Sequence, residues 1–197
     1  MIAVLVDTPI HGTPHDTAYG LSAPIATQTI GGQDVLLCAP TFADPRAAVR
    51  ALKDLGATHL WLCEAVASLS PLLDNGDWLV PDDYIDGTRG QHYTYFSEKA
   101  GGYVQQVPPF DSDSRDALIR AAQGVAARTF KRAVYVCVTV HGWKRPPRPH
   151  SGHGQARTSP GATSAPYPTL ARELEMKVAA LVGQPQRAVN PQGTRWI

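Results

Sequence analysis

The chain has 197 residues, of which 43% are hydrophobic and 18% are charged, and its formal net charge is +1. This composition excludes a disordered chain, and the length suits one domain with a hydrophobic core of ordinary size. The near-neutral charge excludes the basic surface typical of proteins that bind nucleic acid or an anionic membrane. No apolar run reaches the roughly 20 residues that a membrane-spanning helix needs.

The first part of the chain predicts three strands. Residues 1–6 are apolar, but neither the basic residues nor the cleavage site of a signal peptide accompanies them, so they predict a first strand. Residues 11–23 are expected to form a loop rich in glycine, proline and histidine. The segments 24–30 and 33–39 predict a hairpin, because the two glycines between them tolerate the positive φ angles of a tight turn.

Three segments have the apolar spacing of a helix. The first begins at Asp44-Pro45, since an aspartate caps free N–H groups and a proline suits the first turn, and Gly56 is expected to end it. The second helix is predicted over 111–127 and the third over 168–182. The third presents one apolar face, formed by Leu170, Leu174 and Val178.

Later strands are predicted over 58–63, 78–81 and 132–140. The last of these is almost entirely apolar and β-branched, which is typical of the centre of a covered sheet. Strands that alternate with helices predict an α/β sandwich with a mixed sheet. The segment 143–166 lacks periodicity, and a loop of this length is uncommon in a compact domain.

Cys38, Cys63 and Cys137 each lie in an apolar, strand-like run. This pattern predicts reduced, buried thiols in a cytoplasmic protein; a reactive thiol is the alternative, although no basic neighbour is evident to lower a pKa. The histidines at 141, 150 and 153 have no spacing typical of a zinc site, and we expect them to be solvated. Similarly, the basic run 144–150 is expected to be a disordered loop rather than an RNA-binding arm.

Two other groups of residues each have two interpretations. Asp82, Asp83 and Asp86 could form an acid/base pair, but acids at strand ends more often cap turns, and the capping interpretation is preferred. Three aromatic residues are either a subunit-contact loop or part of the core, and the sequence alone does not separate these interpretations: Tyr93, Tyr95 and Phe96.

Residues 56–96 carry the most specific pattern in the chain. A buried strand is followed by a small-residue turn, a Gly-Asp turn, a strand that ends on acids and an aromatic-rich loop. The motifs in this order are Glu64-Ala65-Val66-Ala67-Ser68-Leu69, Gly76-Asp77-Trp78, Ile85-Asp86-Gly87-Thr88 and Tyr93-Thr94-Tyr95-Phe96. They resemble the 5′-methylthioadenosine phosphorylase and purine nucleoside phosphorylase family, whose runs are Thr/Asn-Ala-x-Gly-Ser-Leu, Pro-Gly-Asp, Asp-x-Phe-Ile-Asp-x-Thr and Thr-Phe-Phe. The match extends with gaps to about residue 182.

The resemblance implies a single domain over 1–197, a three-layer α/β sandwich of the nucleoside phosphorylase type with a mixed central sheet, truncated at its C-terminus. Residues 138–161 are expected to be irregular and 183–197 to be a tail. By resemblance, the protein is a cytoplasmic, homotrimeric glycosyltransferase of purine salvage. It would cleave a purine nucleoside or 5′-methylthioadenosine with phosphate as co-substrate, and without a cofactor, metal, nucleic acid or membrane.

The resemblance also implies site residues, although it assigns no catalytic residue. The residues implied for phosphate are Thr8, Ala65 and Thr163. Those implied for the nucleoside are Glu64, Val66, Ala162 and Ser164.

The departures from the family pattern affect the phosphate and purine sites. Asp7-Thr8-Pro9 stands where the family has a Gly-Gly-Ser/Thr-Gly phosphate loop, and the family's Arg-His-Gly loop and purine-recognising acid have no counterpart. Glu64 replaces a hydroxyl or amide and would repel an anion. We therefore expect weak or absent activity. The alternatives are a non-catalytic nucleoside-binding or oligomerising paralogue, and a decayed gene product without a stable fold.

A shifted reading frame is one hypothesis for the irregular segment. Read one base earlier, the codons of 138–147 permit the family motif Gly-Pro-Arg-Leu/Phe-Glu-Thr-Pro-Ala-Glu, and those of 155–161 permit Gly-Ala-Asp-Val-x-Gly. The normal frame matches again at Ala162-Thr163. Paired insertions or deletions would explain this, either as an error in the sequence or as a real change that overwrites the purine pocket. Resequencing the gene distinguishes the two.

Overall fold

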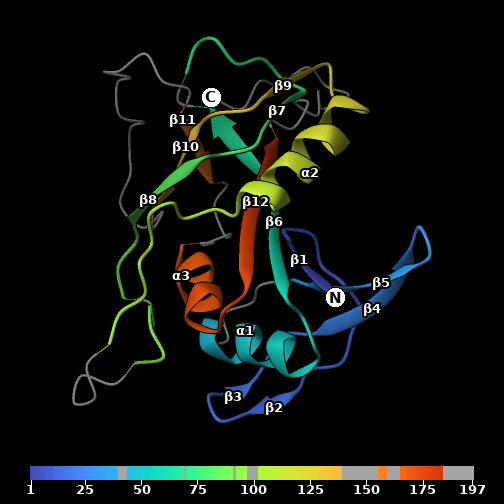
Figure 1. Cartoon of the computed structure of the whole chain (residues 1–197), viewed down its shortest axis with the longest axis vertical. Helices are drawn as coiled ribbons and strands as arrows, with labels where there is room; N and C mark the ends of the chain where they lie inside the picture. Colours follow the sequence, from blue (N-terminus) through green and yellow to red (C-terminus); the bar gives the residue numbers. More distant parts are fainter. Residues whose placement is uncertain are drawn as a thin grey trace, which may run out of the picture.

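The computed structural model describes residues 1–39, 44–68, 70–90, 92–96, 102–138, 155–158 and 165–183. Strands and helices alternate along the chain (Figure 1), as the sequence predicts. The elements are β1 Ile2–Val6, β2 Asp16–Thr17, β3 Gly20–Leu21, β4 Ile25–Ile30, β5 Gln33–Cys38, α1 Pro45–Asp54, β6 His59–Ser68, β7 Asp77–Leu79, β8 Asp83–Gly87, α2 Ser112–Gln123, β9 Arg128–Phe130, β10 Val134–Val138, β11 Gln155–Thr158, α3 Pro166–Glu173 and β12 Lys177–Gly183.

The long strand β6 organises the sheet. Its first part lies between β1 and β12 and is parallel to both, and its end pairs antiparallel with β11. Figure 1 shows β6 and β12 side by side. The sheet continues from β11 through β10 to β8, from β1 through β5 to β4, and from β12 through β7 to β9. Parallel and antiparallel pairs occur together, which confirms the predicted mixed sheet.

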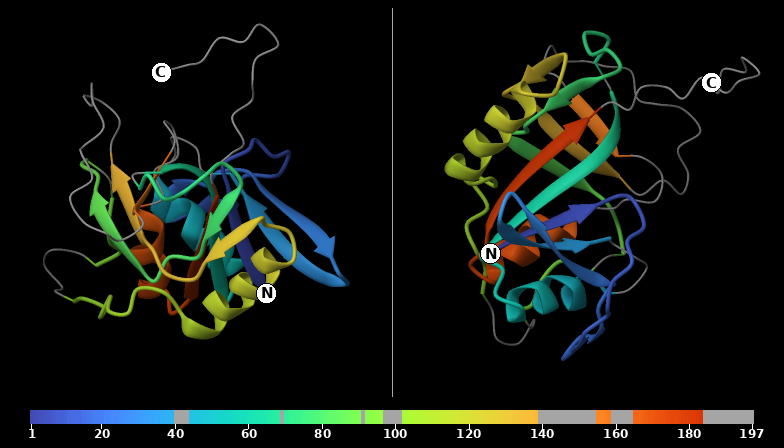
Figure 2. Two further views of the ribbon diagram at one scale, coloured as in Figure 1. Left: turned by 90° about the horizontal axis from the view of Figure 1, so that it is seen from above. Right: turned by 90° about the vertical axis from the view of Figure 1, so that its right-hand side faces the viewer.

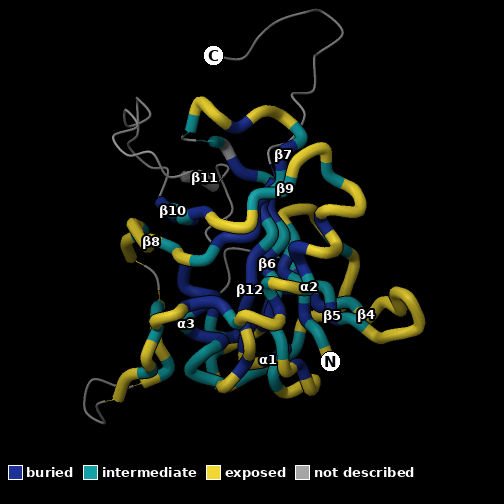
Figure 3. Tube along the Cα trace, turned by 45° about the horizontal axis from the view of Figure 1, so that its top comes forward, coloured by how far each residue is buried: buried dark blue, intermediate teal, exposed yellow. Residues whose placement is uncertain are grey.

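Helices cover both faces of the sheet (Figure 2). Along β12, Val178 and Ala180 pack in the same buried cluster as α1 and α3, whereas Ala179 packs in the cluster of α2. The alternation follows from the strand geometry, which points successive side chains to opposite faces. Figure 3 shows the buried stretches along β6 and β12. The layers are helix, sheet and helix, which confirms the predicted three-layer α/β sandwich.

The predicted hairpin is confirmed as β4 and β5. Gly31 and Gly32 have φ angles of +59° and +79°, which side chains with a Cβ rarely adopt. The turn between the strands is exposed (Figure 3). The preceding segment is not only a loop, because β2 and β3 form a two-stranded hairpin within it.

Asp44 caps α1 as predicted. Its Oδ1 accepts the Arg46 N–H at 2.9 Å, and its Oδ2 lies 2.7 Å from the Arg46 guanidinium. We expect Asp44→Ala to lower the free energy of unfolding by about 1 kcal/mol, because a backbone donor loses its partner. Asp54→Ala, which removes an exposed pair with Arg50 four residues away, should lower it less. Urea unfolding of both variants measures the difference, and equal losses would contradict the capping role.

The helix predicted over 168–182 is wrong in its second half. Helix α3 ends at Glu173, and Glu175 has a φ angle of +58°, which reverses the chain into β12. The segment that follows is buried on both faces, and a short apolar run of this kind cannot be distinguished from a buried helix by periodicity alone. The helix predicted over 111–127 is confirmed in a shorter form as α2, whose N-cap is Asp111.

Besides β2, β3 and β12, three further strands lie where none was predicted. β8 is acidic and β9 has only three residues, so neither carries a strong strand pattern. β11 lies within the segment 138–161 that was expected to be irregular, and it pairs with both β10 and β6. The hypothesis of a shifted reading frame concerns residues 138–161, most of which lie outside the described ranges.

Candidate functional site

A pocket of about 320 Å³ lies beside β1 and β6, at the carboxyl end of β1 and midway along β6. Ligands of open α/β sheets commonly bind outside this edge of parallel strands. Residues 6–8 and 63–65 line the pocket from these two strands, and Trp78, Leu181 and Gly183 line it from β7 and β12. The registers place these segments together, because Val6 pairs with Cys63 while Gly183 pairs with both Ala65 and Trp78.

Glu64 is a buried carboxyl group at this pocket. It is 5% exposed, and its Oε2 accepts the hydroxyl hydrogen of Tyr135 at 2.6 Å. Burial raises the pKa of Glu64 to about 7, and the nearby Asp7 carboxylate adds to the rise while the Tyr135 hydrogen bond opposes it. The group therefore changes charge near neutral pH, which is the range in which an acid or base can exchange protons with a ligand.

Asp7 follows β1 directly and contacts the neighbouring strand. Its Oδ2 accepts the backbone N–H of Ala65 at 2.8 Å. The β1–β6 ladder ends at the pair of Val6 and Cys63, so this contact lies one step beyond the last backbone pair. The Asp7 carboxylate thus takes the place of a strand carbonyl as the acceptor for the Ala65 N–H, at the edge of the pocket.

The other side of the pocket is aromatic. A Cβ atom at Gly183 would lie 3.2 Å from the indole ring of Trp78, so the glycine allows the ring to lie close against β12. Leu181 continues the same lining. An aromatic and aliphatic wall opposite polar groups is typical of pockets that hold a flat organic ligand.

The structure brings together three of the residues implied for the site. Thr8, Glu64 and Ala65 all line the pocket. Val66 does not, because its side chain is 2% exposed and packs in a separate buried cluster. Ala162, Thr163 and Ser164 lie outside the described residues. Asp7 was not predicted as a site residue, although its place in an altered loop was the signal that could have identified it.

The strand-end acids have the predicted capping role. Asp82 accepts the Ala133 N–H at 3.0 Å and pairs with Arg132. Asp83 accepts the N–H of the next residue at 2.8 Å, and Asp86 accepts the Thr88 N–H at the same distance. Each carboxylate is engaged by backbone donors, which argues against an acid/base pair among them.

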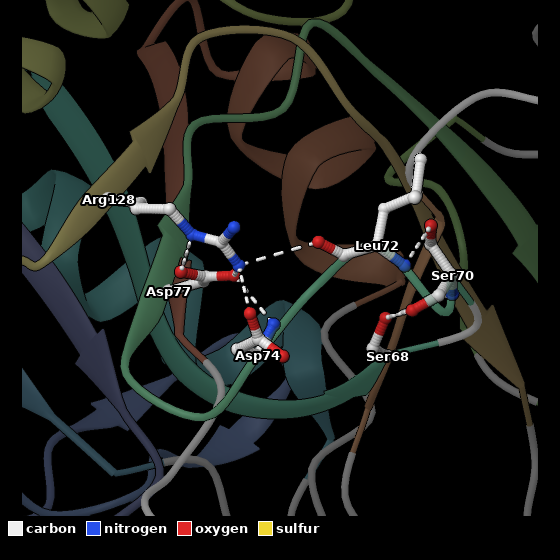
Figure 4. A network of polar contacts seen from close by, with 6 residues as sticks. All are labelled: Ser68, Ser70, Leu72, Asp74, Asp77 and Arg128. Atoms are coloured by element: carbon white, nitrogen blue, oxygen red, sulfur yellow. Dashed lines mark hydrogen bonds and ion pairs between the residues drawn. The ribbon is translucent and has the colours of Figure 1, made fainter.

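A second polar network lies beside β7 (Figure 4). The Arg128 guanidinium binds Asp77 through Nε and Nη2 and binds Asp74 at 2.7 Å. Asp77 also accepts the Asp74 N–H at 2.6 Å, so the network closes the turn before β7. The bidentate pair of Arg128 and Asp77 holds this turn in place, so the network has a structural role and needs no ligand to account for it.

The aromatic loop packs against the core. The Tyr95 hydroxyl donates to the Arg46 carbonyl at 2.8 Å, and its ring lies edge-on to Tyr19 at 5.0 Å. Glu173 accepts the Tyr95 N–H at 2.6 Å. These contacts support the core interpretation for Tyr95. The role in subunit contact stays a prediction, and Phe96 is exposed.

The cysteines are free thiols, as predicted, and Cys38 and Cys137 are buried, whereas Cys63 is only partly buried. Burial raises the pKa of Cys38 to about 12 and that of Cys63 to about 11, and it also raises the pKa of Cys137. High thiol pKa values favour the inert interpretation over a reactive one. Within the described ranges, no group of three or more histidine, cysteine or acidic residues is placed to hold a metal ion, and the histidines at 141, 150 and 153 lie outside them.

In the part of the chain that the structure describes, no helix is long and apolar enough to cross a membrane.

Comparison with known proteins identifies relatives of this chain. It is 30% identical over 174 residues to a probable S-methyl-5′-thioinosine phosphorylase of Methanothermobacter thermautotrophicus, an alignment that covers 84% of the chain and 60% of the relative. It is 36% identical over 93 residues to an S-methyl-5′-thioadenosine phosphorylase of Hyperthermus butylicus, covering 47% of the chain and 34% of the relative. The chain therefore spans less than two thirds of the length of these relatives.

The fold also matches solved structures. One is methylthioadenosine phosphorylase from Schistosoma mansoni in complex with adenine, with a TM-score of 0.74 and 20% identity over 93% of this chain and 80% of that one. A model of the phosphorylase superfamily matches residues 2–183, which is nearly the whole chain. This chain belongs to the phosphorylase superfamily.

Proposed function

We propose that this protein is a nucleoside phosphorylase homologue whose pocket binds a purine nucleoside such as methylthioadenosine or methylthioinosine, with weak or lost phosphorolysis. The similarity to phosphorylases of these two nucleosides supports the ligand class. The pocket's position at the carboxyl ends of β1 and β12 and its aromatic wall support nucleoside binding. We also propose a cytoplasmic location and a homotrimeric state, on family resemblance.

The chemistry of phosphorolysis supports the reduced activity. Phosphate must lie beneath the anomeric carbon while an oxocarbenium-like sugar forms, and an anion of this kind is held by backbone N–H groups, hydroxyls and cationic side chains. The observation that carries the proposal is the Glu64 carboxyl, 95% buried, at the pocket where the family has a hydroxyl or amide. The described residues that line the pocket include two carboxylates and no lysine, arginine or histidine. Asp7, and Glu64 where it ionises above its pKa of about 7, oppose an anionic co-substrate.

An activity assay tests this proposal. The purified full chain is incubated with phosphate and methylthioadenosine, methylthioinosine, adenosine or inosine, and release of the free base is followed by chromatography. We expect a rate at least about a hundredfold below that of an S-methyl-5′-thioadenosine phosphorylase assayed beside it, because a missing electrostatic stabiliser costs this much or more. Robust release of adenine or hypoxanthine would contradict the proposal.

A binding measurement separates a weak enzyme from a non-catalytic nucleoside-binding paralogue. Ligands that bind the folded state raise the melting temperature, so thermal shift with nucleosides reports binding without turnover. An enzyme that retains phosphorolysis should show a larger shift with nucleoside and phosphate together than with either one alone. A shift with nucleoside that phosphate does not change would favour the paralogue.

A further inference from the structure

We propose that the Asp7 carboxylate is an internal oxyanion that occupies the Ala65 N–H at the pocket, and that it determines which ligands the pocket accepts. Free oxyanions such as phosphate, sulfate and carboxylates are excluded while Asp7 is in place, and its removal opens an oxyanion site. This inference rests on the proposed function only in using the same pocket.

The contact itself shows that this donor accommodates an oxyanion. The Ala65 N–H lies 2.8 Å from Asp7 Oδ2, the distance of a charge-assisted hydrogen bond. The two residues are 58 positions apart in sequence, so only the parallel pairing of β1 and β6 brings them together. Asp7 forms no ion pair with any other residue in the described ranges.

The neighbouring backbone explains why the donor is available to a side chain. On its other side, β6 pairs with β12, and Ala65 lies opposite Gly183 in that ladder. On the β1 side the ladder ends at Val6 and Cys63, so the N–H at Ala65 has no strand carbonyl opposite it. Both Asp7 and Ala65 line the pocket, which places the hydrogen bond at its surface rather than in the core.

A tethered carboxylate competes strongly with free ligands. An intramolecular group acts at an effective concentration of about millimolar or above, which a weakly held free anion does not exceed. The negative charge of Asp7 also repels a second anion at the same place. Hence both the occupied donor and the charge disfavour a free oxyanion, and substitution can separate these two effects.

Titration of the full chain with inorganic phosphate tests the proposal. The variants are Asp7→Ala, which removes both the charge and the acceptor, and Asp7→Asn, which removes the charge but keeps an acceptor oxygen. Asp83→Ala is the matched control, since Asp83 is an exposed carboxylate that also accepts a backbone N–H but lies away from this pocket. Binding is followed by calorimetry and by the ³¹P line width at about pH 6, where Glu64, whose pKa is about 7, is mostly protonated.

We expect Asp7→Ala to bind phosphate at least about tenfold more tightly than the unmodified chain, and Asp7→Asn to gain less. Sulfate should follow phosphate. No gain in Asp7→Ala would show that Asp7 only caps the strand end. An equal gain in Asp83→Ala would show an effect of net charge alone, and an equal gain in Asp7→Asn would exclude occupation of the donor; either result overturns the proposal.

The titration includes a check on folding and is independent of nucleoside binding. Thermal melts verify that each variant is folded, and Asp7→Gly replaces Asp7→Ala in the comparison if the alanine variant does not fold. The titration contains no nucleoside, so its failure would leave nucleoside binding and turnover, which are measured separately, unaffected.

Discussion

Glu64→Gln is expected to stabilise the folded chain above about pH 7 by roughly 2–3 kcal/mol and to flatten the dependence of stability on pH between about pH 5 and 7. In the fold, burial raises the pKa of the Glu64 carboxyl from 4.5 to about 7. Over this interval the folded chain holds a proton that the unfolded chain has lost. Stability therefore falls as pH rises from the unfolded value through the folded one, and glutamine removes that loss.

The surroundings of Glu64 support the direction of this change. Asp7 raises its pKa from the end of β1, and Tyr135 on β10 lowers it by hydrogen bonding. Other titratable groups that interact with it are Cys63 on β6, Cys137 on β10 and Tyr167 on α3. None of these is a cation that would stabilise the carboxylate. A glutamine carbonyl can still accept the Tyr135 hydrogen bond, so the substitution removes the charge with little change in packing.

Urea unfolding at several pH values between about 5 and 8 measures this prediction. Asp113→Asn is the control, because its carboxylate is 86% exposed and pairs only weakly with Lys177. Its stability curve should run parallel to that of the unmodified chain. If the curve of Glu64→Gln is parallel as well, Glu64 is ionised in the fold without cost, and its place in the buried site must be revised.

Arg128→Ala is expected to lower the free energy of unfolding at neutral pH, and by more than Arg132→Ala does. Its partner Asp77 has a side chain that is only 2% exposed, so the substitution leaves a buried carboxylate without its counter-ion. Loss of a partner from a fully buried pair costs more, but Arg128 is 47% exposed and water can replace part of the interaction. The turn before β7 contains Asp74, which also accepts a hydrogen bond from Arg128, so this turn should loosen at the same time (Figure 4).

The control for Arg128 is a second arginine–aspartate pair. Arg132 is 87% exposed and its partner Asp82 is 26% exposed, so Arg132→Ala should cost at most about 1 kcal/mol. The Arg128 hydrogen bond lowers the pKa of Asp77 below its ordinary 3.8. The Arg128–Asp77 pair therefore stabilises the fold fully above pH 3.8, and this stabilisation is lost as acid protonates Asp77. Urea unfolding at about pH 3 should show a smaller difference in stability between the unmodified chain and Arg128→Ala. Equal losses from both substitutions at neutral pH would contradict the role of burial.

Local chemistry explains the elements that were predicted. The Gly-Gly turn, the Asp44 cap and the first strand depend on residues adjacent in sequence, and each lies where expected. The same reasoning is wrong for 177–182, because an apolar run is compatible with either a helix or a central strand. Pairing of β12 with β6, which no local signal encodes, decides between them.

For the candidate site, too, some features follow from the sequence and others only from the tertiary structure. By itself, the sequence determined the fold class, because this follows from motif order and residue type. The small-residue turn expected after residue 63 is wrong, since Glu64 and Ala65 lie within β6, which continues to Ser68 because it pairs there with β12 and β11. Only the tertiary structure decided that Asp7 contacts Ala65 and that Tyr135 binds Glu64, pairs that lie 58 and 71 residues apart. Such contacts depend on which strands become neighbours in the sheet, and burial there, rather than residue type, sets the charge state of the carboxyl group.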